Sequence, residues 1–345
     1  MKLATLRNGQ RDGHLVVVSA DARRCIDASP VAPTLLDALE RWTVVEPALH
    51  DLARTVNATA APGAMPFDAR QCLAPLPRTW QWLDGSAFLN HGHLMERAFK
   101  VPPVADFDTI PLMYQGAADD FLGPHDDVAL PSEADQIDFE GEFGVVLSET
   151  PLGVTAEEAL QHVRLIVLIN DWSLRAFGPR EAKSGFGFVQ AKPSTAFAPI
   201  AITPDELGAA WNGGRVHLRL QTQRNGEWFG HPHGGAMHFD FGQLIAHAAR
   251  TRRLSAGTLI GSGTVSNADV AVGSSCIAER RMVEALADGA PHTPFLRFGE
   301  RVRMVALDEQ GQPAPFGVID QMVVPGDAAG PGRVNTLDAI SSIAI

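Results

Sequence analysis

One segment constrains the fold more than any other. Residues 136–147 read QIDFEGEFGVVL, in which apolar and acidic residues alternate, and a period of two predicts a β-strand. Glu140 and Glu142 then lie on one face, with roughly 7 Å between their Cα atoms at about 3.3 Å per residue. Two carboxylates this close repel each other unless a cation lies between them or one is protonated. A solvent-facing acidic stripe is the plainer interpretation of this segment alone.

Most of the remaining chain consists of short apolar runs broken by turn-forming residues. The 345 residues include 32 glycines and 24 prolines, a content that favours turns and short strands over long helices. We therefore expect a β-rich α+β fold. The strands expected beside residues 139–147 cover residues 164–169, 216–222, 258–260, 302–307 and 316–323. The Asn225-Gly226 step predicts a tight hairpin.

The chain divides into two predicted domains. Residues 1–70 form a small N-terminal domain that ends in a linker rich in alanine, proline and glycine, and residues 71–345 form the larger domain. Apolar residues recur at helical spacing over residues 33–52 and 241–254. Capping boxes are expected at Thr155, with Glu158 three residues later, and at Thr203, with Glu206 three residues later.

Composition excludes several classes of function. The formal net charge is -12, so the chain should repel phosphate backbones and nucleic acid is not an expected partner. The longest clear apolar run, LIVLI at residues 165–169, is far shorter than the roughly 20 residues of a membrane helix. The N-terminus lacks the apolar core of a signal peptide, so we expect a cytoplasmic protein without membrane contact. Three scattered cysteines indicate neither disulfides nor zinc.

Two further segments carry candidate site residues. Asp171 follows the apolar strand expected at residues 164–169, a position where sheets often place ligand-binding groups, although a turn or helix cap is the commoner role. Lys192 interrupts an apolar stretch. It is either a buried lysine with an anionic partner or an edge lysine that prevents strand pairing.

Two other segments are weaker when taken alone. WLDGSAFLNHGHLMERAF places Asp84 seven residues before His91, with His93 and Glu96 close behind; a turn aspartate and surface histidines explain it equally well. Residues 261–264, GSGT, could bind a carboxylate through backbone N–H groups or form an ordinary turn. The histidines of HPHGGAMH, residues 231–238, lack helical metal-ligand spacing and are expected in a solvated loop.

Taken together and in this order, the motifs resemble the fumarylacetoacetate hydrolase family. They are DGSAFLNH, PLMYQG, DFEGEFGVV, NDWSLR, AKPSTAFAP, GSGTVSN and FGVIDQ, between residues 73 and 325. The resemblance implies a mixed β-roll catalytic domain behind a small N-terminal domain, and a homodimer. It implies a metal site at Asp84, Glu140, Glu142 and Asp171. It also implies catalytic roles for His91 and Lys192, and substrate contacts from Arg175, Tyr114 and Thr264.

Two residues are candidates for the support of His91. The resemblance favours Glu279, although a small gap is needed between Thr264 and Glu279, and Glu96 is the alternative. Four carboxylates without a thiolate select Mg²⁺ or Ca²⁺, with Mn²⁺ also suitable. We expect His91 to take a proton from water, the hydroxide to attack a carbonyl, and Lys192 to help stabilise the departing enolate. Arg175 would hold a substrate carboxylate.

These expectations describe a metal-dependent hydrolase of carbon–carbon bonds in 1,3-diketo acids. Fumarylacetoacetate, an intermediate of tyrosine and other aromatic catabolism, is the leading substrate, and an acylpyruvate is the alternative. A decarboxylase, hydratase or isomerase of 2-oxo acids would use the same ion. A non-catalytic protein with a structural calcium site is the alternative of another class. Specificity for the substrate tail is expected from loops around residues 111–125 and 224–238.

Overall fold

A computed structural model describes residues 1–99 and 104–326. It shows a mixed α+β fold dominated by one 11-stranded sheet. In sheet order the strands are β4 (Ala64–Pro66), β3 (Arg24–Asp27), β2 (His14–Val18), β1 (Lys2–Leu6), β13 (Ala201–Ile202), β10 (Val163–Asn170), β9 (Gly141–Leu147), β18 (Leu259–Gly261), β5 (Trp82–Gly85) and β6 (Met113–Gly116), with β12 (Ala196–Phe197) beside β10. Neighbours are antiparallel except β18 and β5, which are parallel.

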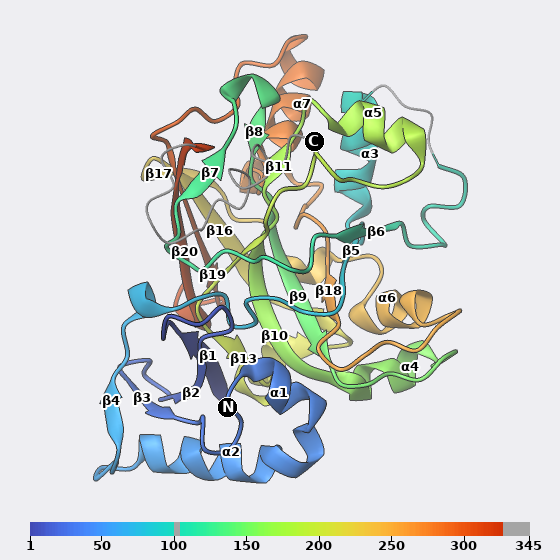
Figure 1. The fold of residues 1–345 in the computed structure, drawn as a ribbon. Coiled ribbons are helices and arrows are strands. Elements are labelled where there is room, and N and C mark those ends of the chain that lie inside the picture. The colour runs from blue at the N-terminus through green and yellow to red at the C-terminus, as the bar shows by residue number, and fades with distance from the viewer. Residues whose placement is uncertain (100–103, 327–345) are drawn as a thin grey trace, which may run out of the picture.

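A second sheet of five strands packs near the first (Figure 1). Its order is β17 (Glu227–Gly230), β16 (Arg219–Arg224), β19 (Arg301–Leu307), β20 (Pro313–Pro325) and β7 (Val128–Leu130). Two small pairs complete the strands: β8 (Ile137–Asp138) with β11 (Ser173–Leu174), and β14 (Trp211–Asn212) with β15 (Arg215–Val216). Asn225 and Gly226 join β16 to β17 with φ values of 53° and 82°. Two positive φ angles define the tight hairpin turn predicted there.

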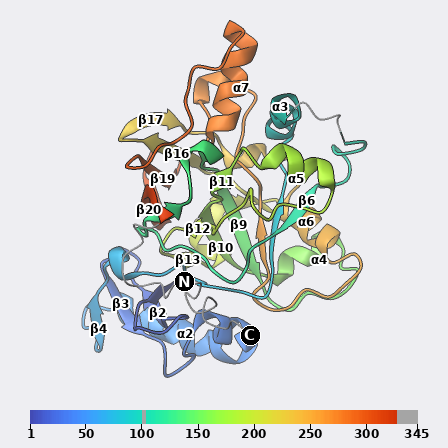
Figure 2. The same cartoon turned by 45° about the horizontal axis from the view of Figure 1, so that its top comes forward.

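The helices lie around the two sheets. They are α1 (Leu35–Glu40), α2 (Trp42–Asn57), α3 (Leu89–Phe99), α4 (Ala156–Ala159), α5 (Gly178–Ser184), α6 (Phe241–Ala248) and α7 (Ile277–Asp288). Short 3₁₀ turns cover Ala69–Gln71, Glu133–Asp135, Leu160–His162, Pro204–Ala210, Gly234–Ala236 and Val270–Val272. Figures 1 and 2 place α2 with the N-terminal strands at one end, and α3, α5 and α7 together at the other. None of the described helices has the length and apolar character to cross a membrane.

Local sequence signals were mostly, but not always, correct. The Thr155 capping box is present, with both reciprocal hydrogen bonds. The predicted box at Thr203 is wrong: a 3₁₀ turn follows it without a side-chain cap. The helix expected over residues 33–52 is two helices that meet at Arg41, and α6 ends at Ala248 rather than near residue 254. The strand expected over residues 216–222 is divided between β15 and β16.

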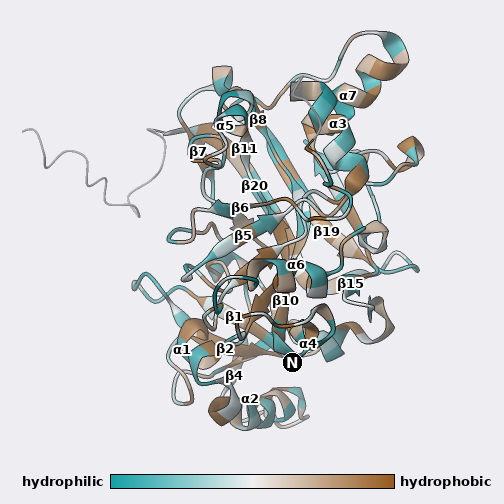
Figure 3. Cartoon of the chain, turned by 90° about the vertical axis from the view of Figure 1, so that its right-hand side faces the viewer, coloured by the Kyte–Doolittle hydropathy of each residue, from teal (hydrophilic) through white to brown (hydrophobic). Residues whose placement is uncertain are grey.

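The central strands are buried on both faces. Phe143, Val145 and Leu147 of β9 belong to one apolar cluster, whereas Val146 belongs to a second cluster shared with the N-terminal strands and helices. Strand β10 likewise contributes alternate residues to both clusters, and Figure 3 shows its apolar character. The acidic face of residues 138–142 therefore cannot be a solvated stripe, since Glu140 and Glu142 are buried.

The N-terminal strands extend the main sheet. Strand β1 pairs antiparallel with β13, where Lys2 lies opposite Ile202 and Leu3 opposite Ala201. The first residues of the chain thus share hydrogen bonds and an apolar cluster with the larger part of the molecule. This arrangement places the N-terminal strands far along the sheet from α3, α5 and α7, so they support β10 without reaching that end (Figure 2).

Candidate active site

Four acidic side chains converge in the main sheet. Asp84 lies in β5, Glu142 in β9, Glu140 just before β9, and Asp171 just after β10. One carboxylate oxygen from each lies within 4.8 Å of the others, and all four side chains are buried. Strand register explains the meeting, because Glu142 lies opposite Ile169 in β10 and Asp84 lies opposite Gly261 of β18. The structure thus gathers the four predicted metal ligands.

Cationic and hydroxyl groups hold two of these carboxylates. Lys192 Nζ donates to Glu140 Oε2 at 2.7 Å and to Asp171 Oδ2 at 2.6 Å. The Tyr114 hydroxyl donates to Asp171 Oδ2 at 2.6 Å, and Thr195 donates to Asp171 Oδ1 at 2.8 Å. Lys192 is therefore a buried lysine with anionic partners rather than an edge lysine, and it lies in a loop after α5.

Arg175 occupies the same end of the sheet but is already engaged. Its Nη2 lies 2.5 Å from Glu140 Oε1, and its Nε donates to Asp138 Oδ2 at 2.8 Å. Asp138 also accepts hydrogen bonds from the first backbone N–H groups of α7, those of Ile277 at 2.7 Å and Ala278 at 2.9 Å. Sequence reasoning placed Asp138 on the acidic face but missed this role, because nothing local in the chain indicates which helix it would cap.

The other two carboxylates lack cationic partners. Asp84 accepts a backbone hydrogen bond from Gly263 at 3.0 Å, so the chain's own carboxylate occupies one of the N–H groups expected to bind a ligand there. Neither oxygen of Glu142 accepts a hydrogen bond from any described residue. Burial, with the charge of Asp171, raises the pKa of Asp84 to about 8. Burial and the charges of Asp84 and Asp171 also raise the pKa of Glu142 well above its usual value.

The pKa of Glu140 is shifted in the opposite direction, downward. Burial alone would raise its pKa, but the positive charges of Lys192 and Arg175 outweigh burial and hold the pKa of Glu140 below its usual value. Two carboxylates are thus balanced by cations, while Asp84 and Glu142 have no ion pair within 4.0 Å in the described part of the chain. When both are ionised, their two negative charges match one divalent cation, which would also remove the cause of their raised pKa values. Oxygen ligands without a thiolate suit Mg²⁺, Ca²⁺ or Mn²⁺.

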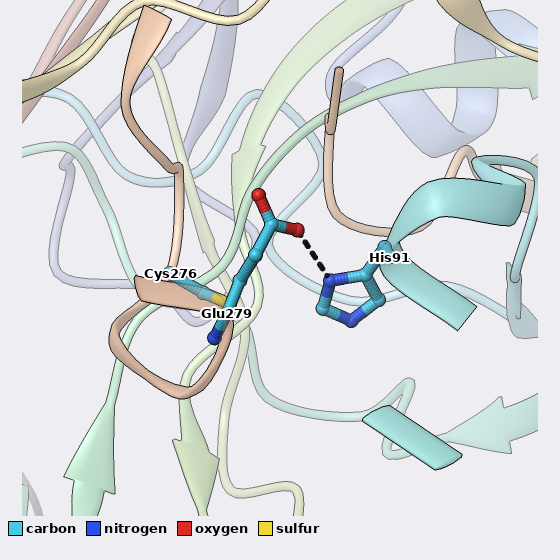
Figure 4. Close-up of side chains that lie close together, drawn as sticks. All are labelled: His91, Cys276 and Glu279. Carbon is cyan, nitrogen blue, oxygen red and sulfur yellow. Dashed lines mark hydrogen bonds and ion pairs between the residues drawn. The ribbon is translucent and has the colours of Figure 1, made fainter. Parts of the chain in front are cut away.

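An imidazole–carboxylate pair stands beside this cluster (Figure 4). His91 of α3 points toward Glu279 of α7, and His91 Nδ1 lies 3.1 Å from Glu279 Oε2. Glu96, the alternative supporting residue, instead lies 4.0 Å from His93. Buried Cys276 accepts the Glu279 backbone N–H at 3.3 Å, and burial raises the pKa of its thiol, so it is an unreactive cap.

A cavity of about 290 Å³ joins these groups. Its walls include predicted site residues of all three kinds: Asp84, His91, Tyr114, Glu140, Arg175, Lys192 and Thr264. The Thr264 hydroxyl is buried and has no hydrogen-bond partner in the described structure, which suits a contact with a ligand. Leu112 and Met113 of the predicted specificity loop also line the cavity, whereas no described lining residue comes from residues 224–238.

The histidine-rich loop does not form a second centre. His231 accepts a hydrogen bond from Trp228, His233 lies 3.1 Å from Glu309, and His238 bonds to the backbone of Asp108. Their partners differ, and no cluster of metal-binding groups among the described residues contains them. The segment is not the solvated loop expected from the sequence, because it contains a β-bridge at His233 and a 3₁₀ turn at Gly234–Ala236 and is largely buried or half-buried.

Comparison with known proteins gives the family. The C-terminal domain described as fumarylacetoacetate (FAA) hydrolase matches residues 81–324, and fumarylacetoacetase N-terminal domain 2 matches residues 1–78. The chain therefore belongs to the fumarylacetoacetate hydrolase family. Its fold is that of fumarylacetoacetate hydrolase from the psychrophile Exiguobacterium antarcticum, with a TM-score of 0.64 at 20% identity over 94% of this chain and 99% of that one.

Relatives in the family differ in the reactions that their names give. The chain is 31% identical to 2,4-didehydro-3-deoxy-L-rhamnonate hydrolase of Sphingomonas sp. (strain SKA58) over 50% of its own length and 56% of that protein. It is 25% identical to the mitochondrial oxaloacetate tautomerase FAHD2B of Homo sapiens over 73% and 76% of the two chains. Maleylpyruvate hydrolase from Sphingobium sp. SYK-6, solved with manganese(II) and pyruvate, shares the fold with a TM-score of 0.62 at 17% identity, over 94% and 100%.

Proposed function

We propose that this chain is a divalent-metal-dependent hydrolase that cleaves a carbon–carbon bond of a 1,3-diketo acid, the class that contains fumarylacetoacetate and the acylpyruvates. The observation that carries the proposal is the His91–Glu279 pair, with 3.1 Å between Nδ1 and Oε2, whose histidine lines the same cavity as Asp84 and Glu140 of the carboxylate cluster. A metal site alone would serve many enolate reactions. A histidine supported by a carboxylate adds a base that can activate water.

Asp84, Glu140, Glu142 and Asp171 would hold the ion, which would be Mg²⁺, Ca²⁺ or Mn²⁺. When bound, it would polarise the oxygens of the diketo acid and lower the cost of the enolate charge. A non-catalytic calcium site would need neither the His91–Glu279 pair nor the buried Lys192, and both His91 and Lys192 line the cavity. We therefore favour the enzymatic role over the structural one.

The protein's own groups can supply the remaining steps. His91 bonds to Glu279 through Nδ1, which leaves Nε2 to take a proton from water, and the carboxylate stabilises the imidazolium that forms. The hydroxide adds to one carbonyl carbon, the bond from that carbon to its neighbour breaks, and the departing carbon takes the electron pair as an enolate. Protonation of this enolate releases the second product. Lys192 and Thr264 line the cavity and can donate to developing negative charge.

In this proposal Arg175 has a structural role in addition to the expected contact with a substrate carboxylate. Its guanidinium lines the cavity but is paired with Glu140 and Asp138. It can still offer an N–H to a substrate carboxylate, while its contacts also fix Glu140 and join that carboxylate to the start of α7. Tyr114, bonded to Asp171, would fix that ligand and meet the substrate with its ring edge.

Tautomerisation of a 2-oxo acid is the second candidate, and a specific observation favours it: the relatives aligned over 73% of this chain include oxaloacetate tautomerases. Assay of the metal-loaded protein on acetylpyruvate, fumarylpyruvate, fumarylacetoacetate and oxaloacetate separates the two. Loss of diketone absorbance with two carbon-cleavage products, identified by chromatography, supports hydrolysis. Enol–keto exchange of oxaloacetate without cleavage of any diketo acid would contradict it.

A further inference from the structure

The cavity that contains the candidate site has two chemically different parts. The charged part is lined by Asp84 and Glu140 of the carboxylate cluster, together with Lys192 and Arg175. Another part is lined by apolar side chains, those of Met95, Val104, Phe107, Leu112, Met113 and Phe188. Val104 and Leu112 are partly exposed, whereas the carboxylates are buried, so the apolar part lies toward the mouth. A substrate whose head reaches the carboxylate cluster must place its tail against this wall.

Contacts place the apolar wall directly beside the reacting groups. The Phe188 ring meets the Tyr114 ring edge to face, with centroids 5.3 Å apart, and Tyr114 bonds to Asp171. Phe107 lies so close to Gly92 that a Cβ on Gly92 would be 3.1 Å from the Phe107 ring. Gly92 follows His91 in α3, so each of the two phenyl rings lies next to a residue that adjoins or belongs to the site.

The described lining residues offer no unpaired Lys or Arg to a charged tail. Lys192 and Arg175 are the Lys and Arg side chains among the described lining residues, and both are paired with carboxylates of the cluster. The remaining charged side chain on the wall is Glu96 of α3. A second carboxylate on the substrate would therefore be desolvated against apolar side chains and near a like charge, which is unfavourable.

We propose that the tail of the substrate is uncharged and apolar. The chain would act on acylpyruvates, or related 1,3-diketo acids, that carry an alkyl, alkenyl or aryl tail, and would discriminate against dicarboxylates such as fumarylpyruvate and fumarylacetoacetate. This inference rests on the proposed function and narrows it. Leu112, Phe107 and Phe188 become specificity-determining residues, because they supply the surface that the tail contacts.

A matched pair of substrates tests this directly. Crotonoylpyruvate and fumarylpyruvate share one carbon skeleton and differ by a methyl group in place of the distal carboxylate. The metal-loaded protein should show a kcat/KM at least about tenfold higher for crotonoylpyruvate, because an unpaired buried charge costs about 1.4 kcal/mol or more. From acetylpyruvate to butanoylpyruvate to hexanoylpyruvate, kcat/KM should rise by up to about fourfold per methylene until the cavity is full.

Substitution of a residue in the cavity wall gives an independent test of the inference. Leu112→Arg should lower the ratio of crotonoylpyruvate to fumarylpyruvate kcat/KM by about tenfold, because it supplies a counter-ion for the second carboxylate. Leu152→Arg is the matched control, since Leu152 is 58% exposed against 38% for Leu112 and does not line the cavity. It should leave the ratio unchanged. Thermal unfolding of both variants checks that they fold.

The possible results distinguish failure of the apolar-tail inference from failure of the proposed function. A wild-type protein that prefers fumarylpyruvate, or that shows no dependence on tail length, overturns the apolar tail while the hydrolase proposal stands. Calorimetric binding of both compounds to the metal-loaded protein compares the tails even without turnover, and tighter binding of fumarylpyruvate would again overturn the inference. Absence of cleavage for every diketo acid would instead refute the proposed function.

Discussion

Asp138 is the buried link between the two halves of the candidate site. Its carboxylate accepts hydrogen bonds from Arg175 Nε and from the N–H groups of Ile277 and Ala278 at the start of α7. Glu279, the partner of His91, is the third residue of that helix. Asp138→Asn keeps the volume of the side chain but removes its charge. We expect this change to weaken the contact with Arg175 and to loosen the position of Glu279.

The expected loss of stability in Asp138→Asn follows from the contacts that Asp138 makes. Removal of one partner of a buried ion pair costs about 3–5 kcal/mol, and Arg175 keeps its contact with Glu140, so the lower end of that range applies. The amide oxygen can still accept from one N–H of α7, so the cap is weakened rather than lost. A loss of about 3 kcal/mol lowers Tm by roughly 6 °C, at about 2 °C per kcal/mol for a large chain.

Activity should fall further than stability explains. Support for a catalytic group is often worth about 10–100-fold, so kcat of Asp138→Asn on a diketo acid should drop within that range while KM changes less. Asp240→Asn is the matched control. Asp240 caps α6 through Gln243, is half-buried and lies 3.7 Å from the half-buried Arg215, and asparagine caps a helix about as well as aspartate. An Asp138→Asn protein with wild-type Tm and wild-type kcat would refute the linkage.

Three further outcomes follow from the site. His91→Ala should retain the metal, measured by elemental analysis, but lose about 10²–10⁴-fold in kcat; full turnover in this variant would exclude His91 as the base. Glu142→Gln should lose both bound metal and activity, because it removes a ligand that has no other partner, and an active, metal-loaded variant would move the site elsewhere. Without metal, the raised pKa of Asp84 favours the folded state below pH 3.8, and this contribution is lost as pH rises toward about 8. Calorimetry with EDTA should therefore show Tm falling over that range, and saturating Mg²⁺ should flatten the slope; equal slopes would contradict a shared metal site.

Much of the cluster could be predicted from local sequence. Alternation placed Glu140 and Glu142 on one face of a strand, and an apolar run identified the buried strand that ends before Asp171. The burial of both faces could not be read from that alternation, because it depends on the N-terminal strands and α2 covering the second face. Chain-wide motifs, rather than local pattern, identified the family.

The long-range contacts were beyond local reasoning. His91 and Glu279 are 188 residues apart, and they meet because α3 packs against α7 through a small apolar cluster. Only the resemblance to a family indicated Glu279, and only the coordinates separate it from Glu96. For Lys192 the sequence left open a buried lysine with an anionic partner or an edge lysine, and only the contacts with Glu140 and Asp171 decide for the first. Apolar neighbours could not decide it, because they occur in buried loops as well as in sheets.

The central claim is that four carboxylates bind one divalent ion beside His91. Crystals grown with Mn²⁺ and measured at the manganese absorption edge test it most directly. The account predicts a single strong anomalous peak per chain within bonding distance, about 2.0–2.6 Å, of oxygens from Asp84, Glu140, Glu142 and Asp171. A peak bound by other residues, or none at saturating Mn²⁺ with Lys192 still bridging Glu140 and Asp171, would contradict it.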